Sequence, residues 1–256
     1  NNNFIDNFFF FLNNVAIGIF ASSGTGTWSI LNNVISNLSQ TGTLTGGGSY
    51  GIFTNSTSGI SFTIQKNTLT NIASSSTYTT DPVASGIIVY SSGTTNNLDS
   101  NTISNIQATY NASSIAIGAS GITTTNASAG GNVLNNKIYN ITNTSNNINS
   151  LINGFKVAGG SWTVANNMIS LSNGANTSAA LLAGIYDNSG VTGTRNYFYN
   201  SVYIGGTGPS DSYGAAMLYN CGSGTAVIKN NIFSMARTGG SSYFYAIANK
   251  TSNTTN

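Results

Sequence analysis

Apolar and polar residues recur along this chain in a fixed order around a short motif, Asn-x-apolar-x-Asn-apolar. The motif is clearest in LNNVISNL (31–38), QKNTLTNI (65–72), DSNTISNI (99–106) and LNNKIYNI (134–141). With looser copies included, its first Asn stands at intervals of 29–35 residues, at Asn3, Asn33, Asn67, Asn101, Asn136, Asn167, Asn196 and Asn231. A glycine followed by an apolar residue keeps nearly the same period, at Gly18, Gly51, Gly86, Gly121, Gly154, Gly184 and Gly214. Two landmarks that keep step with each other predict one structural unit per period.

Each period contains three short segments in which apolar and polar residues alternate. The first follows the glycine, as in GIIVY (86–90), and the second leads into the motif, as in WTVANN (162–167). The third begins after the first Asn of the motif. Alternation with a period of two, in segments rich in β-branched residues, predicts β-strands.

Because the same kind of residue occupies the same place in every period, we expect like residues to stack on one another. The sequence therefore predicts an all-β fold, a right-handed parallel β-helix with three strands per coil and about eight coils of 29–35 residues. Doubly wound and barrel α/β folds need crossover helices, and no segment has an apolar stripe at helical spacing. A β-propeller is the second choice, since its antiparallel blades have a similar period. We expect residues 1–256 to form one β-helix domain within a longer chain.

The first Asn of the motif is expected where the second strand bends into the third, because Asn tolerates the left-handed backbone conformation of a tight bend. Its carboxamide also donates and accepts hydrogen bonds, so stacked copies can form an internal ladder. The predicted ladder consists of the eight motif residues from Asn3 to Asn231. A flat ligand-reading surface of the same residues is less favoured, because apolar residues alternate with them.

The composition limits what this rod can do. Charged residues make up 5% of the chain against 39% hydrophobic residues, with 12 Phe and 13 Tyr, so we expect a real core under a surface of amides and hydroxyls. The net charge of +2 comes without a basic run, which argues against nucleic-acid partners. The longest apolar runs, such as FFFFL (8–12), are too short to span a membrane. We expect any secretion signal to lie outside this sequence.

Acid–base catalysis has few candidate residues here. The acids are all aspartates, and the chain contains no Glu and no His. Glycoside hydrolysis needs two carboxylates within about 10 Å of each other, and no two of these acids share a column in adjacent repeats: Asp6, Asp81, Asp99, Asp187 and Asp211. The sequence therefore predicts no catalytic residue, no metal site and no cofactor. A polysaccharide lyase or hydrolase is the less favoured alternative.

Several residues outside the motif are candidates for packing or binding. Cys221 is the single cysteine and is expected to be a small buried hydrophobe. Trp28 and Trp162 stand five residues before a motif Asn, where packing is favoured over a sugar platform. Exposed aromatics in the variable segments are the candidate glycan contacts, because binding residues concentrate in loops: Tyr78, Tyr110 and Tyr243.

Thr-x-Thr pairs raise ice binding as a third hypothesis. An ice-binding face requires the pairs at one phase in successive repeats. Of four pairs, only those beginning at Thr43 and Thr77 agree in phase. Ice binding is therefore weakly supported.

The last third of the chain contains NYFYNSVYIGGTG (196–208), SYGAAMLYN (212–220) and AVIKNNIFSMARTGGSSYFYAI (226–247). These stretches resemble repeats of large secreted or surface-attached proteins of the Bacteroidota, many of which end in a type IX secretion sorting domain. The repeat columns of the whole chain resemble the pectate-lyase-like superfamily. The resemblance implies an extracellular β-helix at a bacterial cell surface and says little about activity.

Together, the repeat and the resemblance favour a non-catalytic structural or adhesive role, as a stalk, spacer or fibre-forming surface protein. The expected partners are further copies stacked end to end, flanking domains of the same chain, or glycans. A carbohydrate-binding or carbohydrate-cleaving β-helix is the alternative function, and ice binding is the third.

Overall fold

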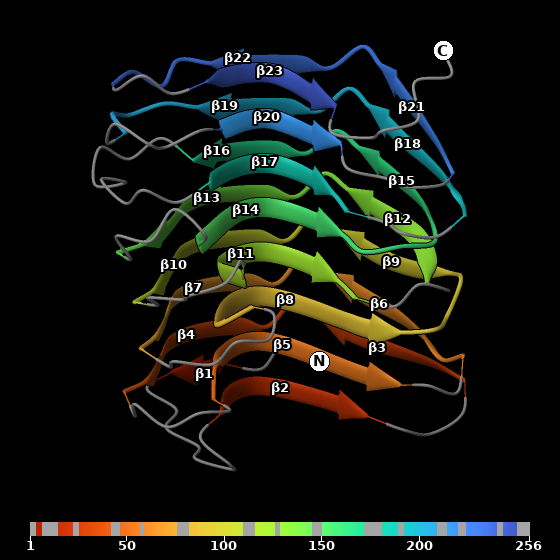
Figure 1. The fold of residues 1–256 in the computed structure, drawn as a ribbon. Coiled ribbons are helices and arrows are strands. Elements are labelled where there is room, and N and C mark those ends of the chain that lie inside the picture. Colours follow the sequence, from red (N-terminus) through yellow and green to blue (C-terminus); the bar gives the residue numbers. More distant parts are fainter. Residues whose placement is uncertain are drawn as a thin grey trace.

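The chain folds into a stack of short strands in the computed structural model (Figure 1). The structure describes residues 4–6, 15–22, 26–41, 47–56, 59–75, 82–109, 116–125, 129–144, 150–171, 181–188, 192–208, 214–219, 224–239 and 243–249. These residues form strands β1 to β23 and contain no helix. The strands build three parallel sheets that are stacked as a β-solenoid, which confirms the predicted fold class.

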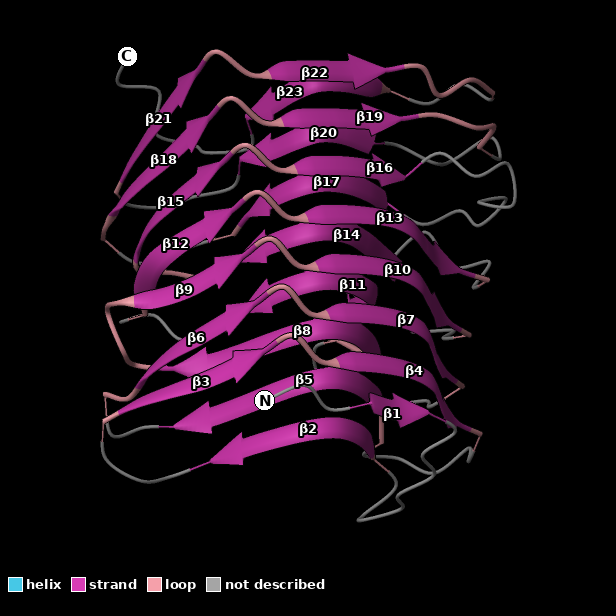
Figure 2. Ribbon diagram, turned by 180° about the vertical axis from the view of Figure 1, so that it is seen from behind, coloured by secondary structure: helices cyan, strands magenta, loops and turns pink. Residues whose placement is uncertain are grey.

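We number the sheets by the order in which each coil visits them (Figure 2). The first sheet contains β2 (Ala16–Ser22), β5 (Ser49–Ser56), β8 (Ala84–Ser91), β11 (Ala116–Thr124), β14 (Ser150–Val157), β17 (Leu181–Asp187), β20 (Gly214–Tyr219) and β23 (Phe244–Asn249). The second sheet contains β3 (Thr27–Leu31), β6 (Ser61–Gln65), β9 (Asn96–Asp99), β12 (Gly130–Leu134), β15 (Ser161–Ala165), β18 (Thr194–Phe198) and β21 (Thr225–Lys229). The third sheet contains β1 (Phe4–Asp6), β4 (Val34–Gln40), β7 (Thr68–Ser74), β10 (Thr102–Ala108), β13 (Lys137–Asn143), β16 (Met168–Leu171), β19 (Ser201–Ile204) and β22 (Ile232–Met235).

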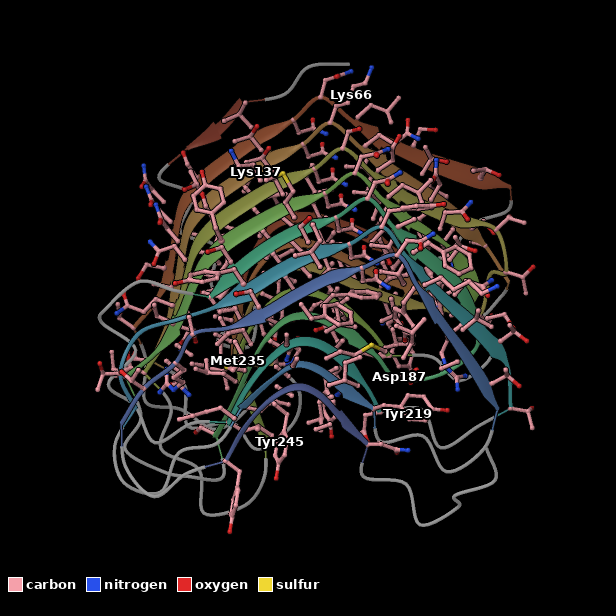
Figure 3. All side chains as sticks on the ribbon, turned by 90° about the horizontal axis from the view of Figure 1, so that it is seen from above. Lys66, Lys137, Asp187, Tyr219, Met235 and Tyr245 are labelled. Carbon is pink, nitrogen blue, oxygen red and sulfur yellow. The ribbon has the colours of Figure 1, made fainter. Side chains whose placement is uncertain are left out.

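Each coil takes one strand from each sheet in turn. Within the described ranges there are seven such groups of three strands, from β2-β3-β4 to β20-β21-β22, with β1 before them and β23 after them. The sequence predicted about eight coils. Seen along the rod, the cross-section has three sides, with Lys66 at the corner between the second and third sheets (Figure 3).

From Gly18 to Gly184 the glycine landmark lies inside the first strand, whereas the sequence pattern predicted that the strand begins at the glycine. Strand β8, for example, begins at Ala84, two residues before Gly86. Gly214 begins β20 and pairs with Leu182, and Ala216 takes the glycine place in that strand. A Cβ atom at Gly86 would lie 2.4 Å from Cγ2 of Ile103 in the third sheet and 2.7 Å from the carbonyl oxygen of Gly121 in the next coil. The glycine is therefore required because two sheets meet there, and not because a strand starts there.

The inner strands of the first sheet are largely buried on both faces. Consecutive residues Ile87 and Ile88 of β8, which point to opposite faces, are both buried, and all eight residues of β14 are buried. A parallel sheet covered on both faces reads as a continuous apolar run, as these strands do. The alternation expected from the sequence is clearer in the third sheet, where Ile35, Leu69, Ile103 and Ile138 point into the core.

The bend between the second and third strands has a left-handed residue, but it is not the first Asn of the motif. It is the residue before the Asn that stands at each bend: Asn32, Lys66, Ser100, Asn135, Asn166, Tyr199 and Asn230, each with φ between 55° and 57°. Since Lys, Ser and Tyr also occupy this place, the backbone bend does not explain the motif. The motif Asn is selected by its side chain instead.

A second left-handed position occurs within the third strands of four coils. It is occupied by Asn37, Asn71, Asn105 and Asn140, with φ between 54° and 58°. Their side chains form an outer ladder, in which Asn71 and Asn105 each donate from Nδ2 to Oδ1 of the preceding member at 3.0 Å. The shorter strands β16, β19 and β22 lack this residue. In these shorter strands the second buried apolar residue, Leu171 or Ile204, stands four residues after the ladder Asn. In the longer strands the corresponding residue, such as Ile106 or Ile141, stands five residues after it.

Candidate functional site

The most regular polar feature of the molecule is a column of buried asparagines at the bend into the third sheet. Each member except the last donates from Nδ2 to Oδ1 of the Asn in the next coil at 2.8–3.0 Å, and from its backbone N–H to the same oxygen. The column consists of Asn33, Asn67, Asn101, Asn136, Asn167, Asn200 and Asn231. The predicted stacking of asparagines is thus confirmed.

The second Nδ2 hydrogen of each inner member completes the network. Asn101, for example, donates to the carbonyl oxygen of Ile64 in the preceding coil at 2.8 Å. The side chain therefore satisfies both of its donors and its acceptor inside the rod. These residues hold neighbouring coils in register and are not available to a ligand.

Asn196 does not belong to this ladder, and the prediction that it does is wrong. It lies half-buried in β18, opposite Thr163, and Asn200 takes the ladder position. With Asn200 in the bend, Tyr197 fills the core place three residues before it. With Asn196 in the bend, that place would fall to Gly193 and the core would lose a large side chain. Asn3 lies outside the described residues.

A buried ionic cluster links the first and second sheets. Arg195 donates from Nε to Oδ2 of Asp187 at 2.9 Å, and the hydroxyl of Tyr197 donates to the same oxygen at 2.8 Å. Arg195 also donates from Nη1 to the carbonyl oxygen of Gly160 at 3.2 Å. All three side chains have no exposed surface. Figure 3 places Asp187 at the side of the rod where the first sheet meets the second.

Burial and then the carboxylate of Asp187 raise the pKa of Tyr197 well above its usual value of 10.0. The hydroxyl therefore keeps its proton and donates to Asp187 at all ordinary pH values. Because no part of the cluster reaches solvent, a substrate could contact it only if the coil opened. The cluster is thus a structural element, in which one carboxylate is satisfied by a cation and a phenol.

Reasoning from the sequence missed this cluster, although a signal was present. Arg195 occupies the inward column that holds Phe62 and Trp162, five residues before the ladder Asn. A charged residue in a column of core aromatics requires a buried partner. When the motif is aligned on Asn196, Arg195 falls outside the column of Phe62 and Trp162, and its need for a buried partner is not visible.

The remaining acids do not come together with Asp187 in the part of the chain that is described. Asp99 lies in β9 of the second sheet and accepts hydrogen bonds from Ser100 and Asn135, each at 2.9 Å. Asp81, Asp211 and the side chain of Asp6 lie outside the described residues. Within the described ranges, no three His, Cys, Asp or Glu side chains gather where they could hold a metal ion.

The two tryptophans differ in their surroundings. Trp162 is buried and donates from Nε1 to the carbonyl oxygen of Gly159 at 2.9 Å. Trp28 is 41% exposed in β3, at the edge of the described second sheet. Packing thus decides the role of Trp162, while Trp28 lines an open recess beside Phe20.

Of the candidate glycan contacts, only Tyr243 lies within the described residues, and Tyr78 and Tyr110 lie outside them. Tyr243 precedes β23 and is 71% exposed. Its ring stacks on that of Tyr245, with centroids 6.3 Å apart and an angle of 14° between the planes. The two rings form a stacked, exposed aromatic pair at one end of the first sheet. Cys221 also lies outside the described residues.

The sequence analysis did not identify a groove on the outer face of the third sheet. It crosses β13, β16, β19 and β22 and has a volume of about 560 Å³. Two outward columns line it: Lys137, Met168, Ser201 and Ile232 in one, and Tyr139, Ser170, Tyr203 and Ser234 in the other. We call it the tyrosine groove. Tyr139 and Tyr203 are 37% and 43% exposed, and a serine follows each of them in the next strand.

Within the described part of the chain, no helix is long and apolar enough to cross a membrane. Comparisons of this chain with family models, with curated proteins and with solved structures found no match.

Proposed function

We propose that this chain is a non-catalytic, extracellular structural or adhesive element, which serves as a stalk, spacer or fibre-forming part of a larger surface assembly. The observation that carries the proposal is the buried asparagine ladder, which links Asn33 to Asn231 through every intervening coil. A continuous ladder resists the separation of neighbouring coils, and stacked coils of this kind form a stiff rod.

The distribution of ionisable groups supports a non-catalytic role. Catalysis by general acid and base requires titratable groups that reach the substrate. The one described carboxylate with a cationic partner, Asp187, is sealed inside the rod. The other carboxylate whose side chain is described, Asp99, is held by Ser100 and Asn135.

The resemblance of the repeat columns to the pectate-lyase-like superfamily, and of residues 196–247 to Bacteroidota surface proteins, favours a bacterial cell surface as the location. Flanking domains of the same chain or further copies are the proposed partners. The edge strands β22 and β23 expose Ile232 and Ile247, and such an edge favours pairing with another parallel strand.

The structural role can be tested by mechanical and enzymatic assays on the full chain. Pulling on the two ends in a force spectrometer should give high unfolding forces that fall in an Asn101→Leu variant. Incubation with neutral and acidic polysaccharides should release neither reducing ends nor unsaturated sugars. Release of either product, with loss of that release in an Asp99→Asn variant, would show that the rod is an enzyme.

Carbohydrate binding is the second candidate, because Tyr243 and Tyr245 present two nearly parallel, exposed rings. Sugars stack on such aromatic faces. Affinity electrophoresis in gels that contain soluble polysaccharides should retard the chain, and a Tyr245→Ala variant should migrate freely. Tyr90→Ala is the matched control. Tyr90 in β8 is 40% exposed, close to the 46% of Tyr245, and it belongs to none of the ring pairs between described residues.

A further inference from the structure

The tyrosine groove lies on a sheet face whose backbone is already paired. Strands β16 and β19 each pair with a parallel neighbour on both sides. A partner therefore cannot add to this face as a further strand, and it must be recognised through the side chains that line the groove.

The spacing of the two tyrosines selects the conformation of a ligand. Tyr139 and Tyr203 occupy one column two strands apart, which places their backbones about 9.6 Å apart along the rod. An extended strand repeats on one face about every 6.7 Å, and an α-helix has a pitch of about 5.4 Å. A polyproline II helix has three residues per turn and repeats about every 9.3 Å. Of these conformations, polyproline II alone matches the interval between the rings.

The shape of the lining suits proline rings. Ser170 lies between Tyr139 and Tyr203 in the same column, so a small side chain forms the floor between two aromatic walls. Ser234 repeats this floor beyond Tyr203. A Cβ atom at Gly205 would meet the ring of Tyr203 at 2.8–3.0 Å, so this wall is held in place by the backbone beneath it. A wall that is already positioned lowers the entropy cost of binding.

The polar groups of the lining match the backbone of such a ligand. Polyproline II has no internal hydrogen bonds, and its carbonyl oxygens remain available as acceptors. The groove offers the hydroxyls of Ser201 and Ser234, which can donate to them.

The single charge in the groove favours one direction of a bound ligand along it. Of the lining residues, all of which are described, Lys137 alone is charged. It lies at one end of the groove, in β13, with Nζ 5.5 Å from the centroid of the Tyr139 ring. An uncharged ligand core with one acidic residue at that end is complementary to this arrangement.

We infer that the tyrosine groove binds a proline-rich segment of a partner protein in the polyproline II conformation, with prolines over Ser170 and Ser234 and an acidic residue against Lys137. The groove recognises two prolines three residues apart, as in Pro-x-x-Pro. This interaction is independent of the stiffness of the rod, because Tyr139, Ser170, Tyr203 and Ser234 alternate with the core residues of their strands.

The test uses the full chain and fluorescein-labelled synthetic peptides with Pro-x-x-Pro repeats and one glutamate at either end. Fluorescence anisotropy should give saturable binding, and replacing the prolines by alanine should weaken it about tenfold or more. Tyr203→Ala should remove one wall, and Ser170→Leu should fill the floor between the walls. Each variant should weaken binding about tenfold or more. Lys137→Gln should lower affinity for one glutamate orientation only and should reduce its dependence on salt.

Tyr90→Ala is the control, since Tyr90 is exposed on the first sheet, away from the groove, and should leave binding unchanged. Melting temperatures of all variants show whether each chain is folded. The proposal is overturned if no proline peptide binds saturably, or if binding persists in both Tyr203→Ala and Ser170→Leu. It is also overturned if neutral oligosaccharides bind in the groove, with loss in Tyr203→Ala, while the peptides do not.

Discussion

Gly86 of the first sheet lies directly against Ile103 of the third sheet, in the same coil. A Cβ atom at Gly86 would lie 2.4 Å from Cγ2 of Ile103. The same relationship joins Gly121 to Ile138 and Gly154 to Ile169, at 2.5 Å and 2.4 Å. The two landmarks that keep step along the sequence are therefore two sides of one contact, repeated in the coils from Gly18 to Gly184.

Replacing Gly86 by alanine should destabilise the rod, because the new methyl group overlaps both the Ile103 side chain and the carbonyl oxygen of Gly121. We expect a loss of about 1–3 kcal/mol in the free energy of unfolding, measured by chemical denaturation. Ile103→Ala alone should lose about 2–5 kcal/mol. The double variant should lose less than the sum of the two, with a coupling of about 0.5–3 kcal/mol. Additive losses would mean that the two residues do not meet.

Breaking the asparagine ladder should cost stability in proportion to the polar groups left unpaired. Asn101→Leu removes the hydrogen bonds to Asn136 and to the carbonyl oxygen of Ile64, and leaves Asn67 without its acceptor. We expect a loss of about 1–3 kcal/mol, seen as a lower melting temperature. Asn132→Leu, on the exposed face of β12, is the control and should change stability by about 0.5 kcal/mol or less. An unchanged melting temperature for Asn101→Leu would count against the ladder.

The buried pair of Asp187 and Arg195 should be more sensitive to loss of one partner than to loss of both. Arg195→Met removes the cationic partner of the buried Asp187 carboxylate, and we expect a loss of about 3–5 kcal/mol. Asp187→Leu combined with Arg195→Met removes both charges and should recover much of that loss. Denaturation of the two variants beside the unaltered chain gives the comparison. A double variant as unstable as Arg195→Met would contradict this account.

Stability should fall at alkaline pH because of Tyr197. Burial and Asp187 raise the pKa of Tyr197 in the folded protein above its usual 10.0, so the folded state keeps a proton that the unfolded state loses. The contribution is fully present below pH 10.0 and declines as the pH rises above it, by about 1.4 kcal/mol per pH unit. Tyr197→Phe should be less stable at neutral pH but should lose stability more slowly above pH 10.0. Equal slopes for both proteins would rule out this linkage.

Sequence reasoning could predict the ladder but not every member of it. Around residues 196–200, the stretch Asn-Tyr-Phe-Tyr-Asn offers two asparagines four residues apart. Both asparagines fit the repeat motif, so the motif alone does not show which of them joins the ladder. The choice of Asn200 follows from packing, which places Tyr197 in the core and pairs Asn200 with Asn167 and Asn231.

The same shift concealed the tyrosine groove. Tyr139 and Tyr203 both stand three residues after a ladder Asn, at Asn136 and Asn200. When the motif is aligned on Asn196, Tyr203 falls out of that column. The sequence predicted binding aromatics in the variable segments, because binding residues concentrate in loops, whereas the groove lies on the repeating third sheet.

The repeat in the sequence is enough to predict a stack of parallel coils, because residues that stack on copies of themselves recur at a fixed period and with a fixed alternation. Which asparagine enters the ladder, why glycine recurs, and which side chains form the buried cluster and the groove follow only from the folded chain. These depend on contacts between sheets and between coils. Such contacts join residues that are far apart in the chain, and no local pattern records them.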